Sequence, residues 1–384
     1  MNVIHVITRL ILGGAQENTV LTCEGLHARG HDVTLITGPA LGPEGELETR
    51  ARAGGYRFIV MDELRREIHP GRDWRSYRRL LALLRELSPD VMHSHSSKAG
   101  ILARQAAFKL GGMNIVHTIH GLPFHPFQGL LANRLYKTLE RRAARQSDAI
   151  LCVADAMTRQ ALAAGVGRPE QYTTVYSGME VSPYLTRPSE ADEFRRSLGL
   201  TRDDVLVTQI SRLAELKGHE YIIQAARGIA DPRVHFCFVG DGRWRAKIEG
   251  WIRAAGPGLA KRFHLTGLLP PARMPEIMHA SGIVVHASLR EGLARAIPQA
   301  MLAGRPVISF DVDGAAEVVT AETGILLPPR DAAGLQLAIE TLAASPELRA
   351  KLGLAGQSRC REQFDHNRMV EQIETVYERL LAKP

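Results

Sequence analysis

The sequence predicts two α/β domains in tandem, each with a doubly wound parallel sheet that carries helices on both faces. Short apolar runs rich in β-branched residues alternate with helical stretches along the whole chain, which is typical of repeated βαβ units. A length of 384 residues also exceeds what one hydrophobic core usually organises. The alternation pauses at 181–189, where Pro183 and Pro188 punctuate a polar stretch that we interpret as a linker. The fold class is therefore α/β, with two Rossmann-like domains facing across a cleft.

Thirteen strands are expected. Seven precede the linker, at 3–8, 32–38, 56–62, 91–95, 114–120, 149–154 and 172–178. Six follow it, at 205–211, 234–240, 262–267, 282–288, 306–311 and 324–328. The first run is short and lacks both a basic leader and a small-residue cleavage site, so we interpret it as a buried strand and not as a signal peptide. The boundaries predict an N-terminal domain at 1–180 and a C-terminal domain at 181–365.

Composition restricts the class of protein. Apolar residues make up 45% and charged residues 23%, values typical of a soluble globular protein. Cys23, Cys152, Cys237 and Cys360 are widely spaced and form no C-x-x-C pair, which favours reduced thiols in a cytosolic protein. No apolar run approaches the roughly 20 residues that span a bilayer. We expect a cytoplasmic protein, with peripheral contact to the inner face of the cytoplasmic membrane as a further option.

The net charge of +7 is uneven, because five of the seven surplus positive charges lie in residues 1–180. With 5% aromatic residues and no nucleic-acid-binding signature, only charge would support a nucleic-acid partner, and we expect none. Phosphorylated ligands or an anionic membrane explain the charge at least as well. The stretch 129–146 could dock on such a membrane as a basic amphipathic helix, although an ordinary surface helix also fits its pattern.

The ends of the predicted strands carry the candidate binding residues, because ligands of doubly wound sheets bind there. Gly13 and Gly14 follow the first strand and would let a ligand approach the backbone closely, although a tight turn explains them equally well. The pattern G-x-G-x-x-G is absent here, so hydride transfer loses its main support. Arg212 and Lys217 flank a loop after the strand at 205–211, which favours diphosphate binding over two solvated charges. Backbone groups near Gly267 could meet the edge of a nucleobase.

The stretch REGLARAIPQ (290–299) holds one carboxylate at a helix entrance. Pro298 fits the first turn of the helix, so Glu291 lies in the preceding loop. The N–H groups of 292–296 lack helical partners, and a phosphate would satisfy them. Glu291 would repel that phosphate, so its expected partners are neutral sugar hydroxyls. Gln299, one to two turns further on, could reach another hydroxyl pair such as that of a ribose.

These residues resemble a known family. EGLARAIPQAMLAGRPVISFDVDG (291–314), SRLAELKG (211–218) and GGAQ (13–16) look like family 4 retaining glycosyltransferases, whose fold is GT-B. HSHSSKAG (93–100) and HTIHGLPFHPFQ (117–128) resemble a bacterial subgroup that builds cell-surface polysaccharides. The resemblance covers essentially the whole chain. It implies that the last helix, within 366–384, packs back on the N-terminal domain.

The resemblance also implies roles for individual residues. Arg212 and Lys217 would hold the donor diphosphate, Glu291 would bond to the donor sugar, and His120 would lie beside that sugar across the cleft. These four form the candidate catalytic set. The candidate donor-binding residues are Gly13, Gly14, Gly267, Leu268, Gly292, Leu293, Ala294, Arg295 and Gln299. The candidate acceptor-side residues are His95, Ser96 and Lys98, for which a serine-capped helix start is an equally good explanation.

One residue departs from the family pattern E-x7-E, because Gln299 stands where the second glutamate commonly binds the ribose. The expected reaction is that of a hexosyltransferase: a sugar moves from a nucleoside diphosphate, with UDP expected, to a hydroxyl of a glycan or lipid-linked acceptor. Retention of configuration, no cofactor and no metal are expected with it. A glycosidase would need two suitably spaced acids, and this stretch supplies one.

The sequence also allows a metal site and two other functions. Asp311-Val312-Asp313 has the D-x-D form of a metal site, and the histidines at 93, 95, 117 and 120 raise the same possibility, but strand-end histidines more often line a pocket or pack in a core. A nucleotide-sugar epimerase on the same scaffold, which needs no acceptor, is the rival enzyme. A non-catalytic sugar-nucleotide-binding subunit is the third hypothesis.

Overall fold

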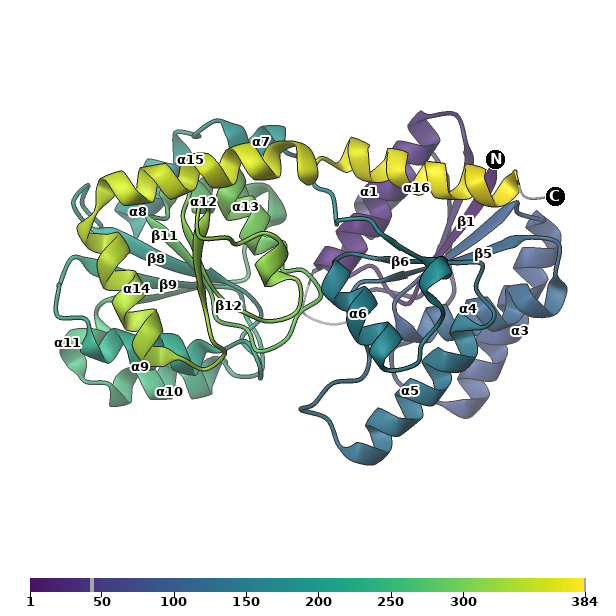
Figure 1. Ribbon diagram of the computed structural model, residues 1–384, viewed down its shortest axis with the longest axis horizontal. Helices are drawn as coiled ribbons and strands as arrows, with labels where there is room; N and C mark the ends of the chain where they lie inside the picture. The colour runs from purple at the N-terminus through teal and green to yellow at the C-terminus, as the bar shows by residue number, and fades with distance from the viewer. Residues whose placement is uncertain (42–44, 383–384) are drawn as a thin grey trace. The chain divides into compact units, whose positions relative to one another are not determined.

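A computed structural model of the chain describes residues 1–41 and 45–382 (Figure 1). The chain divides into two compact units. Unit 1 comprises Met1–Met179 together with the C-terminal segment from Phe364, and unit 2 comprises Glu180–Gln363. The chain therefore leaves unit 1 after its seventh strand and returns to it at its last helix.

Unit 1 is built on a seven-stranded sheet in which every strand is parallel to its neighbours. The order is β3-β2-β1-β4-β5-β6-β7, so the direction of strand succession reverses between β1 and β4. The strands are β1 (Asn2–Ile7), β2 (Asp32–Thr37), β3 (Arg57–Val60), β4 (Val91–His95), β5 (Asn114–Ile119), β6 (Ala149–Cys152) and β7 (Tyr172–Thr174). Ligands of open α/β sheets bind beyond the carboxyl ends of the strands at such a reversal.

Helices cover both faces of this sheet because its inner strands carry apolar side chains on both sides. Val3 and Ile7 of β1 join one hydrophobic core with helices α1 (Gly14–Ala28) and α16 (His366–Leu381). Ile4 and Val6, which point to the opposite face, join a second core with α3 (Pro70–Leu87) and α4 (Ser97–Leu110). Unit 1 also contains α2 (Glu48–Ala53), α5 (Leu130–Ala144), α6 (Asp155–Ala163) and the 3-10 turn η1 (Pro169–Gln171).

The last helix, α16, is part of the core of unit 1. Its residues Met369, Val370, Ile373 and Tyr377 are buried. A Cβ atom at Gly25 of α1 would lie 2.6 Å from Val370, so α1 and α16 pack closely at this glycine. Glu374 also pairs with Arg29 at 2.9 Å and with His31 at 2.6 Å. Figure 1 shows this helix beside α1, far from it in the sequence.

Unit 2 repeats the architecture with six parallel strands in the order β10-β9-β8-β11-β12-β13. They are β8 (Val205–Ile210), β9 (Val234–Val239), β10 (Phe263–Gly267), β11 (Ile283–His286), β12 (Val307–Phe310) and β13 (Gly324–Leu327). Its helices are α7 (Ser182–Leu185), α8 (Glu190–Ser197), α9 (His219–Gly228), α10 (Arg245–Ala254), α11 (Pro257–Ala260), α12 (Met274–Ala280), α13 (Ala296–Leu302), α14 (Ala332–Ala344) and α15 (Pro346–Gln363), with 3-10 turns η2 (Pro271–Arg273) and η3 (Ala315–Glu317). Val205 and Val207 face α9 and α14, while Leu206 faces α8 and α12.

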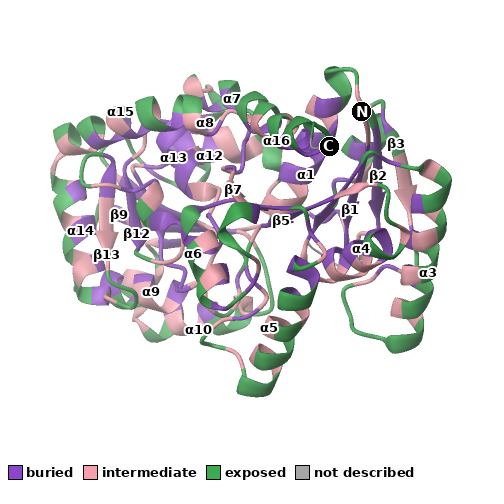
Figure 2. Cartoon of the chain, turned by 45° about the vertical axis from the view of Figure 1, so that its right-hand side comes forward, coloured by how far each residue is buried: buried purple, intermediate pink, exposed green. Residues whose placement is uncertain are grey.

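The predicted α/β class is confirmed, and each of the thirteen predicted runs coincides with a strand. The stretch 181–189, predicted as a linker, begins unit 2 and contains the single helical turn α7. In each unit the inner strands are buried, the edge strands β3, β7, β10 and β13 are mostly half-buried, and the outer faces of the helices are exposed (Figure 2). Within the described residues, no helix combines the length and the apolar character that a membrane span requires.

Candidate functional site

Two loops at the carboxyl edge of the unit 2 sheet join into one surface. The loop after β8 and the loop after β11 meet where the Leu289 N–H donates to the Leu216 carbonyl at 2.8 Å. Gly218 has φ +73°, and a Cβ atom there would lie 1.8 Å from the Ala287 carbonyl oxygen. Only glycine fits this position, because any side chain would push the two loops apart.

A buried amide on β8 holds the same two loops together. Gln209 donates from Nε2 to the Lys217 carbonyl at 3.0 Å and accepts at Oε1 from the Ala287 N–H at 3.2 Å. It therefore fixes the backbone from which the Lys217 side chain extends. Gln209 was not among the site residues predicted from the sequence. The signal was a polar side chain inside the apolar run VLVTQIS, where a buried amide must find partners.

Lys217 and Glu291 form an ion pair between these loops. Their side chains are 17% and 22% exposed, and the buried His286 at the end of β11 places Nε2 3.5 Å from Glu291 Oε1. Burial alone would raise the pKa of Glu291, but Lys217 and His286 outweigh it and hold that pKa well below the usual value of a glutamate. Glu291 is therefore ionised at neutral pH and can accept hydrogen bonds.

Asp313 fixes the loop that carries Glu291. Its Oδ2 accepts from the Glu291 N–H at 2.6 Å, and the Gly314 N–H donates to the Gly292 carbonyl at 3.1 Å. Asp313 lies in the left-handed region, with φ +51°. The sequence pattern suggested Asp313 only as part of a D-x-D metal site, whereas in the structure this aspartate supports a neighbouring loop.

The residues that follow Glu291 lie where the sequence predicted. Glu291 precedes α13, and Pro298 occupies the first turn of that helix. In the described part of the chain, the N–H groups of Gly292, Leu293 and Ala294 donate no hydrogen bond. Arg295 is the N-cap residue of α13 and is half-buried, as is Gln299. The Gln299 side chain likewise bonds to no described residue.

Other predicted residues of unit 2 lie outside the ion pair. Arg212 is exposed in the loop after β8 and forms no ion pair with any residue of the described ranges. Gly267 ends β10 with φ +75°, and its carbonyl accepts from the Gly240 N–H at 2.9 Å. The neighbouring Leu268 is exposed. The structure thus brings Lys217 together with Glu291 but leaves Arg212 and Leu268 open to solvent.

In unit 1, Gly13 and Gly14 begin α1, and the Gly13 carbonyl accepts from the Glu17 N–H at 3.0 Å. Ser96 is the N-cap residue of α4, but its hydroxyl bonds to Thr8 Oγ1 at 2.7 Å and does not cap the helix. Lys98 pairs with Asp73 at 2.5 Å and also donates to the Glu67 carbonyl. The charge of Lys98 is therefore already shared with a carboxylate of the protein.

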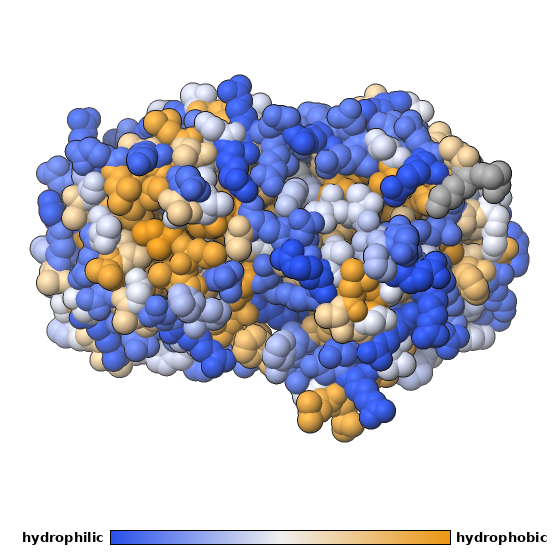
Figure 3. Space-filling model, viewed as in Figure 1, coloured by the Kyte–Doolittle hydropathy of each residue, from blue (hydrophilic) through white to orange (hydrophobic). Residues whose placement is uncertain are grey.

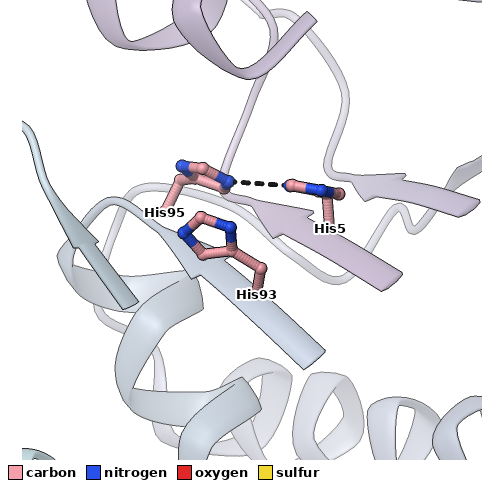
Figure 4. Close-up of side chains that lie close together, drawn as sticks. All are labelled: His5, His93 and His95. Atoms are coloured by element: carbon pink, nitrogen blue, oxygen red, sulfur yellow. Dashed lines mark hydrogen bonds between the residues drawn. The ribbon is translucent and has the colours of Figure 1, made fainter. Parts of the chain in front are cut away.

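The predicted histidines of unit 1 form a hydrogen-bonded cluster. His95 Nδ1 lies 3.1 Å from His120 Nε2, and His117 Nδ1 lies 2.9 Å from Ser94 Oγ. Among the described residues, the group with metal-compatible spacing consists of His5, His93 and His95, whose ligand atoms lie within 4.8 Å of one another (Figure 4). The sequence pattern did not predict a role for His5, because this residue lies within the first strand and 90 positions from His95.

Comparison with known proteins identifies the chain. The family described as Glycosyltransferase Family 4 matches residues 12–182, and the family described as Glycosyl transferases group 1 matches residues 190–359. The two matches lie side by side and leave only short segments outside them. The chain belongs to glycosyltransferase family 4. The resemblance inferred from the motifs is confirmed, and the protein is an enzyme that transfers glycosyl groups.

Named relatives and solved structures agree with this family. The UDP-Gal:alpha-D-GlcNAc-diphosphoundecaprenol alpha-1,3-galactosyltransferase of Escherichia coli is 29% identical over 82% of this chain and 80% of its own length. The structure of HepE from Anabaena in complex with UDP-glucose has a TM-score of 0.85 at 23% identity and covers 99% of this chain and 100% of that chain. Sucrose-phosphate synthase from Thermosynechococcus elongatus has a TM-score of 0.85 at 20% identity over the full length of both chains. The fold of this glycosyltransferase is accordingly GT-B.

Proposed function

We propose that this glycosyltransferase moves a hexose from a UDP-sugar to a hydroxyl of a lipid-linked or polysaccharide acceptor in cell-envelope glycan synthesis, with retention at the anomeric carbon. The arrangement of Lys217, Glu291 and His286 carries the proposal. A cation and a carboxylate, both partly exposed, are fixed side by side at the carboxyl edge of a parallel sheet. This edge is where such sheets bind their ligands.

The proposed chemistry assigns each group of this edge to one part of the donor. Lys217 and the exposed Arg212 would stabilise the departing diphosphate, together with the N–H groups of Gly292 and Leu293. Glu291, kept ionised by its neighbours, would accept hydrogen bonds from hydroxyls of the sugar. The half-buried Gln299 would bond to the ribose. The role of His120, contact with the donor sugar, follows from the family resemblance.

The bond changes in this proposal balance without a covalent enzyme intermediate. The bond between the anomeric carbon and the diphosphate oxygen breaks, and a bond from that carbon to the acceptor oxygen forms on the same face. The acceptor proton moves to the departing phosphate oxygen. Side-chain cations and loop amides supply the positive field, so the proposal includes no metal and no cofactor. A chelator should then leave the turnover rate unchanged.

Similarity to named proteins supports the choice of donor and acceptor. The relative from Escherichia coli is named for a UDP-sugar donor and a diphosphoundecaprenol-linked acceptor. The HepE structure contains UDP-glucose. We therefore propose a UDP-sugar as donor and a sugar on a polyprenyl diphosphate as acceptor for this chain.

A thermal-shift screen of UDP-, GDP- and ADP-sugars tests the donor site, because a ligand that binds only the native state raises the melting temperature. UDP-sugars should give the largest shift, and Lys217→Ala should abolish it. The matched control is Lys261→Ala, which removes an exposed lysine of the same unit and should keep the shift. An unchanged shift in Lys217→Ala would remove Lys217 from the site. Interconversion of nucleotide sugars without any acceptor would favour the epimerase instead.

The start of α5 supports a second part of the proposal, docking on an anionic membrane. Leu130 and Leu131 are each 87% exposed, and Leu135 is also exposed. Exposed basic residues occupy the same helix at Arg134, Arg141 and Arg142, and the exposed Arg145 is its C-cap residue. Figure 3 shows an apolar group projecting at the lower edge of the view, where Figure 1 places the beginning of α5. Apolar side chains beside positive charges fit the boundary between acyl chains and anionic headgroups.

Vesicle co-sedimentation tests this docking. The wild type should bind vesicles that contain phosphatidylglycerol more strongly than vesicles of phosphatidylcholine alone, and Leu130→Ser combined with Leu131→Ser should reduce the binding. The matched control replaces two exposed leucines of unit 2, Leu337→Ser with Leu354→Ser. Equal loss in both double variants would show that α5 is not the docking element.

A further inference from the structure

Three histidines of unit 1 form a continuous hydrogen-bonded chain. His5 on β1 places Nδ1 3.0 Å from Nε2 of His95 at the end of β4, and Figure 4 shows this bond. His95 in turn places Nδ1 3.1 Å from Nε2 of His120, which follows β5. His5 and His95 are completely buried, whereas His120 is half-buried. The chain therefore connects the interior of the sheet to a candidate site residue.

The register of the sheet produces this chain. β1 and β4 pair so that His5 lies opposite His93, and β4 and β5 pair so that His95 lies opposite Thr118. Strand positions two residues apart share a face of the sheet, so His93 and His95 both lie on the face of His5. His120 follows the end of β5 and meets the outer end of this row.

The number of protons on the three histidines limits the directions in which their hydrogen bonds can run. A neutral imidazole has one N–H donor and one acceptor nitrogen, so both bonds must run in the same direction. His5 Nε2 is buried and has no partner among the described residues. If the bonds ran toward His5, this nitrogen would carry an orphaned N–H, and buried N–H groups without an acceptor are rare. The favoured order has His5 Nδ1–H donating to His95, and His95 Nδ1–H donating to His120 Nε2.

The surroundings keep these histidines neutral. Burial lowers the pKa of His5 to about 3. Burial also holds the pKa of His95 well below its usual value, helped by the neighbouring His93 and His5. A charged His95 or His120 would carry an N–H on both nitrogens and would break one bond of the row, and a charged His5 would place an N–H without an acceptor at its buried Nε2.

His93 makes a metal site less favourable than a hydrogen-bonded chain. Its Nδ1 bonds to the Tyr377 hydroxyl at 2.5 Å and its Nε2 to Thr118 Oγ1 at 2.7 Å, so both nitrogens are already engaged. Its ring lies 4.3 Å from the His95 ring, tilted by 31°. A metal ion held by His5, His93 and His95 would have to replace one hydrogen bond of His95 and one of His93.

We propose that His5 and His95 are positioning residues that hold the ring of His120 in one orientation and as the neutral tautomer protonated at Nδ1. The donor sugar would then meet an imidazole whose proton is in a defined place. This catalytic consequence rests on the proposed function, because only that proposal gives His120 a role at the sugar. The hydrogen-bonded chain itself does not depend on it.

Two substitutions at His95 separate the bonds of the chain. The side-chain amide of asparagine lies at nearly the same distance from the backbone as Nδ1, and that of glutamine reaches nearly as far as Nε2. His95→Asn should therefore keep the bond to His120, and His95→Gln should keep only the bond to His5. His117→Asn is the matched control, because it removes a buried imidazole outside the chain and keeps the bond to Ser94.

Nitrogen-15 NMR of the histidine rings at neutral pH and transfer kinetics give the two readouts. His120 should carry its proton on Nδ1 in the wild type and in His95→Asn, and should become a mixture of tautomers in His95→Gln. In His95→Gln, kcat should fall by about 10-fold to 100-fold with little change in the donor KM, because the reacting groups are misplaced. His95→Asn should lose less kcat than His95→Gln, and His117→Asn should stay close to the wild type. Melting curves show whether each variant folds, and His5→Asn with His5→Gln repeat the test if the His95 variants do not.

Each outcome decides the proposal. A proton on Nε2 of His120 in the wild type, or one equivalent of zinc in the purified protein, would overturn the chain. Equal activity of His95→Asn and His95→Gln would overturn the positioning role. A wild type with the expected tautomer but without transfer activity would support the chain and contradict the proposed function.

Discussion

The two units place different chemistry at equivalent positions of their two sheets. β1 and β4 of unit 1 correspond in the strand order to β8 and β11 of unit 2. In unit 1 these strands bring buried, neutral imidazoles together at His5, His93 and His95. In unit 2, His286 at the end of β11 faces the charged pair of Glu291 and Lys217. The sheet decides where side chains meet, and the side chains decide whether charge persists there.

The difference arises from the partners available to each histidine. His93 and His95 have hydroxyl and imidazole partners, which do not compensate a buried positive charge. His286 lies 3.5 Å from a carboxylate that is itself paired with a lysine. A charged, partly exposed sheet edge suits binding of a polar ligand, whereas a row of buried, neutral imidazoles suits holding a neighbouring side chain in place.

The largest expected effect is on the stability of unit 1, which contains a buried pair of charges as well as its neutral histidines. Arg104 and Glu140 form a buried ion pair there, at 2.8 Å. Arg104→Met should lower the free energy of unfolding by about 3–5 kcal/mol, because Glu140 would remain as an uncompensated buried charge. Denaturant unfolding measures the change. The double variant Arg104→Met with Glu140→Leu should recover much of the loss, and a loss below about 1 kcal/mol in the single variant would contradict the prediction.

The next effect tests the charged edge of unit 2. Glu291→Gln should lower kcat/KM by about 10²–10³-fold, because a neutral amide replaces the ionised acceptor proposed to contact the sugar. Initial transfer rates measure this change, and melting curves check the fold. Glu249→Gln, which alters a surface carboxylate on α10, serves as control. Turnover of Glu291→Gln close to that of the wild type would remove Glu291 from the proposed machinery.

A smaller effect is the loss of folding stability in acid, which should begin at a different pH for the histidines of unit 1 than for Glu291 of unit 2. Burial lowers the pKa values of His5 and His117 in the folded state, so the unfolded chain binds more protons and stability falls as the pH drops below about 6.5. The pKa of Glu291 is also lowered, and its contribution is present above about pH 4.3 and is lost as the pH falls further. Each group contributes at most about 1.4 kcal/mol per pH unit.

Melting temperatures between pH 7 and 3 measure both parts of this dependence. His117→Asn should reduce the loss that begins below about pH 6.5, and Glu291→Gln should reduce the loss only below about pH 4.3. The exposed His27 provides a control, since His27→Asn should leave the profile unchanged. The same dependence of melting temperature on pH in the wild type and in all three variants would show that His117 and Glu291 do not account for the acid sensitivity.

The smallest effect concerns Gln299, which departs from the family pattern. Gln299→Glu should tighten UDP-sugar binding by about 1 kcal/mol, or roughly fivefold, because an ionic hydrogen bond to the ribose is stronger than a neutral one. Isothermal titration measures the affinity. Gln299→Ala should weaken binding, and equal affinities in all three proteins would place the ribose elsewhere.

Local pattern was sufficient for many parts of this protein. The alternation of apolar runs predicted all thirteen strands, and Pro298 predicted the start of α13 after the loop of Glu291. Local pattern did not predict the supports of the site. Gln209, Asp313 and His5 act through partners that are distant in the sequence. A sequence pattern does not state which strands pair or which of their residues lie opposite each other.

The sequence by itself determined the α/β class, the two sheets and the family to which the chain belongs, because periodicity and short motifs are local properties of the chain. The tertiary structure decided that Lys217 meets Glu291, that Lys98 is already paired with Asp73, and that His5 ends a chain leading to His120. These contacts depend on which strands lie side by side and in which register. Charge, proton position and hydrogen bonding follow from that arrangement, since each depends on distances between residues far apart in the sequence.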